Sequence, residues 1–299
     1  MPLRRYVLLL LAAAGVLPAA AATLVPAEMT APPQPIVVTA LAAAPAVDGD
    51  LGDWAADGWT RVAVQPAVRD DAQNRLGSIE VDLRAGVFDG RFYLAARWPD
   101  ARADTEYKPW EWGGKHYRRG KPQDDSFAVR FDLDGDYNSC MIADADYRVD
   151  VWHWSAGRSD PTGYADDNWH LITTRFLDHA AEYTGPGGKT VYIRKSRDQG
   201  SAGYATAKPD RKSFQGDKLP GIEWGGSPEG SAADVAAKGA WADGHWQVEM
   251  SRALVTGHDD DAELPLGAIR VGAIAVFDRN DAEHKSVSGD LHFDFRALR

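Results

Sequence analysis

The chain has 299 residues, a formal net charge of −11 and a single cysteine, Cys140. The acidic charge argues against nucleic acid or an anionic membrane surface as partner, because both select for basic proteins. One cysteine excludes an intrachain disulfide. We therefore expect the partner to be a small molecule or another protein.

Residues 1–22 have the features of a secretory signal peptide. Arg4 and Arg5 precede an apolar run, and four alanines at 19–22 offer small-residue cleavage positions. No later segment approaches the roughly 20 apolar residues that a membrane helix needs. The expectation is an exported protein without a membrane span, which would be periplasmic if the source is Gram-negative.

Residues 23–46 are rich in Ala, Pro and Thr and are interpreted as a linker, so that one folded domain would cover 47–299. Short strand-like runs then recur between turn signals, and Asp89-Gly90 and Asp243-Gly244 are typical hairpin turns. This pattern predicts an all-β fold, an antiparallel β-sandwich with long loop insertions and a few short helices. The predicted strands are 79–88, 91–97, 126–132, 147–154, 246–250 and 269–277.

No nucleophile elbow, phosphate-binding loop or dinucleotide fingerprint is present, which lowers the expectation of a hydrolase or dehydrogenase. Asp132, Asp134 and Asp136 alternate around a glycine, as ligands do in calcium loops. The twelfth-position Glu of such a loop is missing. A polar turn between two strands is the alternative interpretation.

The segment VDVWHWSAGRSDPTGYADD at 149–167 concentrates aromatic, cationic and turn-forming residues. Strand alternation puts His153 on one face and Trp152 and Trp154 on the other, and Pro161 with Gly163 forms a sharp turn. The residue types suit the lining of a cofactor pocket. On residue types alone, they fit a tryptophan-rich sandwich core better.

Residues 184–232 are rich in Gly, Lys, Ser, Asp and Pro, and are interpreted as one long insertion. Aromatic residues recur in it at Tyr192, Tyr204, Phe214 and Trp224. Such anchors suggest that the insertion drapes over the sandwich.

Met141 and the segment DRNDAEHKSVS at 278–288 contain possible metal ligands. A methionine beside a polar turn is usually a core filler, but its thioether can also bind low-spin haem iron. His284 and Lys285 follow an apolar strand and could supply a second ligand. A solvated loop is the alternative interpretation of these two residues.

Four segments together resemble the haem-binding domain of ethylbenzene dehydrogenase type. This domain occurs in the haem b gamma subunits of type II enzymes of the dimethyl sulfoxide reductase family and in related exported cytochromes. The segments are VDGDLGDW at 47–54, the region 140–167, VAAKGAWADGHWQVEMSRAL at 235–254 and IAVFDRNDAEHKSVSGDLHF at 274–293. The resemblance spans essentially the whole mature domain, and 149–167 with 274–293 is its most specific part.

The resemblance implies one non-covalent haem b, with Met141 and Lys285 as axial ligands of the iron. A lysine binds a metal only as the neutral amine. His284 is the alternative to Lys285, and on a strand only one of two neighbours can point at the iron.

The resemblance further implies that Trp152, His153 and Trp154 line the pocket and that Arg158 pairs with a haem propionate. Two protein ligands leave no open position on the iron, so the protein is expected to transfer electrons rather than to catalyse a reaction at the haem. Its partner would be a redox protein, either the subunits of a molybdenum enzyme or a soluble cytochrome.

Two alternatives remain at the level of the sequence. The first is a carbohydrate-binding or ligand-sensing sandwich module, in which some of the eleven tryptophans stack on sugar rings and Asp132, Asp134 and Asp136 hold calcium. The second is a domain of the same type that has lost its haem. Only the 274–293 segment separates the haem protein from a sugar binder, which has no reason to contain it.

Overall fold

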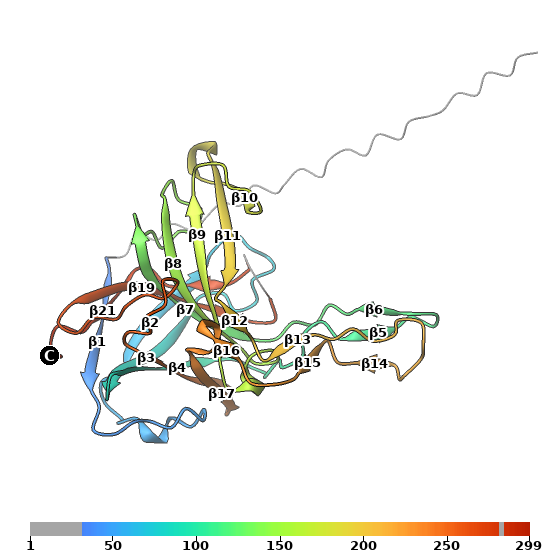
Figure 1. Ribbon diagram of the computed structural model, residues 1–299, viewed down its shortest axis with the longest axis horizontal. Helices are drawn as coiled ribbons and strands as arrows, with labels where there is room; N and C mark the ends of the chain where they lie inside the picture. The colour runs from blue at the N-terminus through green and yellow to red at the C-terminus, as the bar shows by residue number, and fades with distance from the viewer. Residues whose placement is uncertain (1–31, 281–283) are drawn as a thin grey trace, which may run out of the picture.

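Two β-sheets pack face to face in the computed structural model, which describes residues 32–280 and 284–299 (Figure 1). The first layer has the strand order β10-β11-β9-β8-β7-β19, and β20 and β21 both pair with β19. The second layer has the order β2-β3-β4-β18-β17. The strands are β1 (Gln34–Ala40), β2 (Thr60–Pro66), β3 (Ile79–Phe88), β4 (Arg91–Pro99), β5 (Trp110–Trp112), β6 (Tyr117–Arg119), β7 (Ser126–Gly135), β8 (Tyr147–Ser155), β9 (Asp166–Thr173), β10 (Ala181–Thr184), β11 (Thr190–Arg197), β12 (Gly200–Ser201), β13 (Tyr204–Thr206), β14 (Lys218–Leu219), β15 (Ile222–Trp224), β16 (Glu229–Gly230), β17 (Ala236–Ala242), β18 (His245–Ala253), β19 (Ile269–Phe277), β20 (Ser286–Val287) and β21 (Leu291–Asp294). Four short 3₁₀ helices complete the described elements: η1 (Leu51–Asp53), η2 (Asp160–Thr162), η3 (Pro186–Gly188) and η4 (Ser231–Ala233).

Aromatic side chains fill the space between the two layers. Phe92 on β4 packs edge-on against Phe131 on β7 and Trp152 on β8, with ring centroids 6.1 and 6.0 Å apart. Trp154 on β8 meets Trp246 on β18 at 5.0 Å. These contacts connect strands of opposite layers, so the sandwich predicted from strand alternation is confirmed.

The two predicted hairpins form at the expected dipeptides. Asp89 and Gly90 both have positive φ, 45° and 72°, and join β3 to β4. Asp243 and Gly244, with φ of 51° and 73°, join β17 to β18 in the same way. Two consecutive positive φ values match the right-handed twist of paired strands.

The expectation of a linker up to residue 46 is wrong for 34–40. These residues form β1, which runs parallel to both β21 and β3 and joins the two layers at one edge. Ile36 and Val38 point into the core and are 1% and 0% exposed. The surrounding Ala and Pro residues obscured this short apolar alternation.

The long insertion does not drape over the sandwich as expected. Its first part, β11, pairs with β9 as a regular strand of the first layer. The part after residue 198 pairs mostly with itself or with β5, and forms an arm that projects from the sandwich together with β5 and β6 (Figure 1). Trp224 and Tyr204 lie at its base, where they donate to the Arg158 carbonyl and the Asp166 carboxylate.

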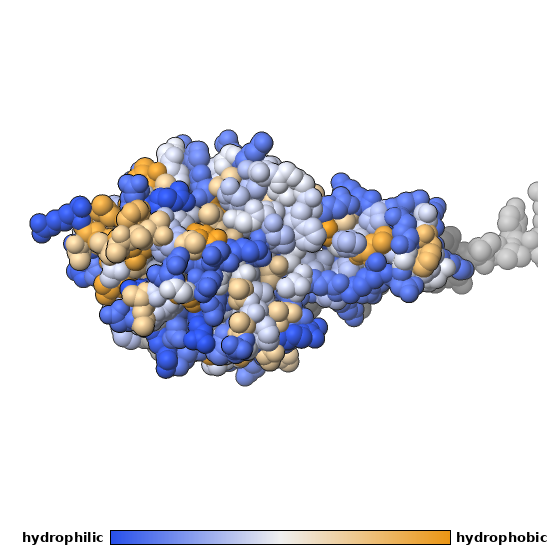
Figure 2. Space-filling view, turned by 90° about the horizontal axis from the view of Figure 1, so that it is seen from below, coloured by the Kyte–Doolittle hydropathy of each residue, from blue (hydrophilic) through white to orange (hydrophobic). Residues whose placement is uncertain are grey.

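Hydrophilic residues cover most of the arm in the space-filling view (Figure 2), and the larger apolar area of this view lies at the opposite end of the molecule. No helix within the described ranges is long and apolar enough to cross a membrane.

Candidate cofactor-binding face

Strand β8 divides its side chains between two different environments. Trp152 and Trp154 point between the layers and are 0% exposed, whereas His153 points away from the second layer. The expectation that all three line one pocket is therefore wrong, because neighbours on a strand face opposite sides. Trp152 and Trp154 belong to the core, which was the alternative interpretation of this segment.

The face of the first layer that points away from the second layer is called the outer face here. His153 lies opposite Ala128 on β7, Ala128 lies opposite Ala275 on β19, and Ala275 lies opposite Val287 on β20. Directly paired residues share a face of the sheet. Ala128 and Ala275 thus form an apolar strip across the outer face between His153 and β20, which is called the alanine strip below.

Met141 lies in the 136–146 loop and packs against the apolar cluster of the outer face, which contains Val149, Val151 and Phe277. The loop is held in place by polar contacts. Tyr147 Oη donates to the Asn138 carbonyl at 2.9 Å, and a guanidinium nitrogen of Arg130 donates to the same carbonyl at 3.2 Å. The loop therefore presents the thioether on the same face as the alanine strip.

Lys285 and His284 diverge, as alternation requires. Val287 shares a face with Ala275, so Lys285, two residues earlier, also lies on the outer face. Its Nζ is 5.8 Å from the centroid of the Phe277 ring. The Nδ1 atom of His284 instead lies 2.9 Å from Oδ2 of Asp71, on a segment outside the first layer.

A second histidine on the outer face, His170, was missed by the sequence reasoning. It lies on β9 opposite Val149 and beside Lys195 of β11. His170 shares its strand parity with Asn168, which pairs with Val151, so His170 lies on the same face as Val151. A pairing of the two strands had to be known before this parity could be assigned.

Both histidines carry ring nitrogens that are buried and have no hydrogen-bond partner among the described residues: Nε2 of His153 and Nδ1 of His170. Burial, followed by the positive charges of Arg158, Lys195 and Lys285, lowers the pKa of His153 to about 3. Burial and the charges of Lys195, Arg130 and Lys285 lower the pKa of His170 as well. Both imidazoles are neutral at physiological pH, and each has a free ring nitrogen.

The charges around these histidines are cationic although the chain as a whole carries −11. Lys195 is exposed, and Arg130 and Lys285 are half-buried. Arg158 already has a partner, since its Nε lies 3.1 Å from both oxygens of the buried Asp124. The outer face therefore offers local positive potential, which suits an anionic ligand.

Asp132, Asp134 and Asp136 do not converge on one point in the described part of the chain. Asp134 instead accepts from Nε of Arg148 at 2.9 Å, and Asp136 is exposed. The polar-turn interpretation fits this segment.

The structure has two surface hollows with volumes of about 500 and 370 Å³, and Tyr147 and Ile172 of the outer-face cluster line the larger one. They are lined by residues such as Arg148, Phe176 and Tyr192 and include neither Met141 nor Lys285. Met141, Ile142 and Ala145 of the 136–146 loop pack against the cluster that contains the alanine strip.

These features define a β-sandwich protein in which one face of the first layer combines apolar side chains with nearby cations. A family model described as ethylbenzene dehydrogenase matches residues 52–288, and the chain belongs to this family. No curated protein matches the chain.

Among solved structures, a carbohydrate-binding module of family 9 from Caldicellulosiruptor kristjanssonii is similar in complex with glucose and with cellotriose. Each is 12% identical over 88% of this chain, with TM-scores of 0.38 and 0.40, and the match covers 98% and 95% of the module.

Proposed function

We propose that the outer face binds one non-covalent haem b, with Met141 and Lys285 as the axial ligands of the iron, and that the protein relays electrons. The observation that carries this proposal is the placement of these two residues. They come from a loop and from a strand end far apart in the sequence, yet both lie on the outer face.

The chemistry of the outer face fits a haem. The small side chains of the alanine strip, together with Phe277 and Val151, offer apolar contacts to a macrocycle. The propionates need cations, which Lys195 and Arg130 supply near the strip. Arg158 remains a proposed propionate partner, although a propionate there would compete with Asp124.

His153 and His170 would orient the group rather than bind the iron. Their neutral rings have free nitrogens that could accept or donate a hydrogen bond at the edge of the macrocycle. His284 is the weaker candidate for the second axial ligand, because its ring is engaged with Asp71.

A haem with two protein ligands supplies a one-electron redox centre and no open position for a substrate. The chain would therefore act as an exported cytochrome or as a cytochrome subunit of an oxidoreductase. Its partner would be the subunits of a molybdenum enzyme or a soluble cytochrome. If the source is Gram-negative, the protein would work in the periplasm after removal of residues 1–22.

The alternative of a sugar-binding module is less well supported. Five of the tryptophans, Trp54, Trp98, Trp152, Trp154 and Trp246, are buried, so they cannot stack on a sugar. Among the described residues, the exposed Trp224 and Trp241 use their indole N–H groups on backbone carbonyls.

The haem proposal is tested by expressing the full chain in a haem-competent periplasm and recording its spectrum. A Soret band, sharp bands on reduction and haem extractable into acidified organic solvent are expected. A colourless protein that also fails to take up added haemin would overturn the proposal.

Ligand identity is tested with variants of the loaded protein. Lys285→Ala and Met141→Ala should each abolish the low-spin spectrum, whereas His284→Ala, the neighbouring control, should leave it unchanged. The opposite pattern for Lys285 and His284 would make the histidine the ligand.

A further inference from the structure

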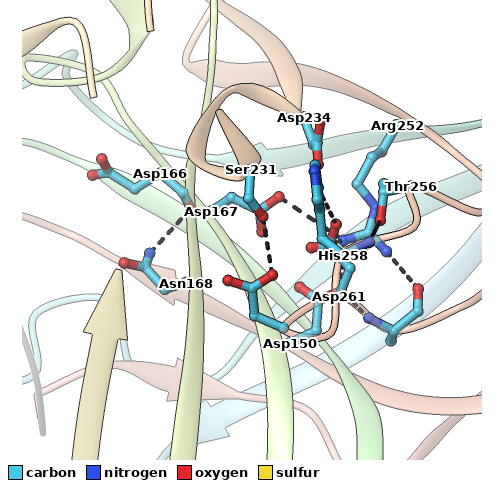
Figure 3. Close-up of polar contacts among 12 residues, drawn as sticks. Asp150, Asp166, Asp167, Asn168, Ser231, Asp234, Arg252, Thr256, His258 and Asp261 are labelled. Atoms are coloured by element: carbon cyan, nitrogen blue, oxygen red, sulfur yellow. Dashed lines mark hydrogen bonds and ion pairs between the residues drawn. The ribbon is translucent and has the colours of Figure 1, made fainter. Parts of the chain in front are cut away.

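Five aspartates converge at one end of the sandwich, on the side of the first layer opposite the outer face. Figure 3 shows three of them, Asp150, Asp167 and Asp261, beside Arg252. Asp150 and Asp167 come from β8 and β9, Asp198 follows β11, and Asp260 and Asp261 lie in the loop between β18 and β19. One ligand oxygen from each of Asp198, Asp260 and Asp261 lies within 4.8 Å of the others, and the same holds for Asp150, Asp167 and Asp261. Asp150, Asp167, Asp198 and Asp261 are at most 6% exposed.

One cation, Arg252, compensates part of this charge. Its Nη1 donates to Asp150 at 2.6 Å and to Asp261 at 2.9 Å, and lies 3.9 Å from Asp167. The guanidinium also lies over the Trp152 ring at 4.7 Å, which fixes it on the Asp150 side of the cluster. A single guanidinium cannot neutralise five carboxylates.

Several carboxylate oxygens of this cluster accept no hydrogen bond from the described residues. Both carboxylate oxygens of Asp198 and both of Asp167 are buried without a hydrogen-bond partner among the described residues. Asp198 is 4% and Asp167 is 0% exposed. Leaving buried charged oxygens unpaired is strongly unfavourable, so this arrangement calls for a cation or for protons.

We propose that Asp198, Asp260 and Asp261, with Asp167 beside them, bind a calcium ion. The donor set is entirely oxygen, which hard cations prefer, and calcium accepts the irregular six- to eight-fold coordination that several carboxylates and backbone carbonyls provide. The nearest imidazole, His258, lies 2.7 Å from Asp234 and forms a separate group with Asp234 and Asp261, so the group of Asp198, Asp260 and Asp261 contains oxygen donors alone.

The ion would join segments that no disulfide connects. Asp167 belongs to the first layer, Asp198 precedes the projecting arm, and Asp260 belongs to the loop after β18, where it also accepts from Ser231 Oγ at 3.0 Å. Calcium here would fix the base of the arm to the sandwich. Because Trp152 lies opposite Asp167 in the β8–β9 pair, the site faces away from His153 and does not depend on haem.

The test uses the full chain, freed of metal with a chelator and then titrated with CaCl₂ or MgCl₂. One calcium per chain by elemental analysis and calorimetry and a raised Tm are expected, with a weaker response to magnesium. Asp198→Asn should weaken calcium binding about tenfold or more. Asp134→Asn, which removes a carboxylate paired with Arg148, should leave calcium binding unchanged.

The competing explanation is that Asp198 is protonated and no ion binds. In that case calcium would not change the Tm of the parent protein, and Asp198→Asn would be as stable as the parent or more stable in chelator. Either result would overturn the proposal. If Asp198→Asn does not fold, Asp260→Asn replaces it, because Asp260 is only half-buried. This variant and the calcium titration of the parent chain then distinguish calcium binding from protonation.

Discussion

Trp152 and His153 are neighbours in sequence but contribute to different properties of the protein. Trp152 packs against Phe92 and Phe131 and supports the Arg252 guanidinium. His153 contacts Phe277 on the outer face. Trp152 therefore contributes to the stability of the core, whereas His153 contributes to the surface on which a ligand is proposed to bind.

We expect Trp152→Ala to lower the free energy of unfolding by about 3–5 kcal/mol, because it leaves a large cavity in the core. His153→Ala should lower it by much less. Urea unfolding followed by circular dichroism measures both. Equal losses would contradict the division of side chains described for β8.

Asp125 makes the stability depend on pH. Burial, together with the negative charge of Asp100, raises the pKa of Asp125 to about 8 in the folded state, against an ordinary value near 4. Between these two values the folded state binds more protons than the unfolded chain, so stability falls as the pH rises from about 4 to 8. In Asp125→Asn the difference in Tm between pH 5.5 and pH 8.5 should shrink. An unchanged difference would show that other groups cause it.

At the level of elements, a glycine in β17 allows this strand to lie close to the Trp154 side chain of the core. A Cβ atom on Gly239 would lie 2.3 Å from the Trp154 ring, and the Gly239 N–H donates to Asp160 at 2.7 Å. The strand can approach β8 this closely only without a side chain at this position.

Gly239→Ala should therefore lower the free energy of unfolding by about 1–3 kcal/mol through overpacking. Gly225→Ala is the matched control, since nothing lies within 4 Å of a Cβ there. Thermal unfolding of the two variants beside the parent provides the comparison. Equal Tm values for the two variants would argue against the close approach.

The elements that sequence patterns predicted are those with local signals. The runs 79–88 and 269–277 coincide with β3 and β19, and the Asp-Gly turns lie where they were expected. β1 and the arm were not predicted, because β1 pairs with β21 and β14 pairs with β5 across long stretches of sequence. The alternation of side chains along a strand was enough to predict that His153 and Trp152 lie on opposite faces of the sheet. The participation of His170 and the convergence of Asp198 with Asp261 required the tertiary pairing.

For the whole molecule, the contrast between the net charge and the outer face affects how a ligand approaches. A chain with a charge of −11 repels anions at long range, so the cations of the outer face must direct an anionic ligand locally. Lys195 is the exposed member of this set.

We expect Lys195→Glu to weaken haemin binding several-fold, and the difference from the parent to decrease at high salt. Lys208→Glu makes the same change in net charge on the exposed part of the arm and should have little effect. Stopped-flow or equilibrium titration at two ionic strengths measures both. Equal weakening by the two variants would mean that net charge alone governs binding.

The position of β1 determines when the sandwich can be completed. This strand is made early, yet it bridges β3 and β21, and the β21 partners of its first residues lie at 291–294. The two layers can therefore be closed along this edge only after residues 291–294 have been synthesised. Contacts between segments so far apart in the sequence form slowly during folding, so the closure of this edge is expected to be a late folding step.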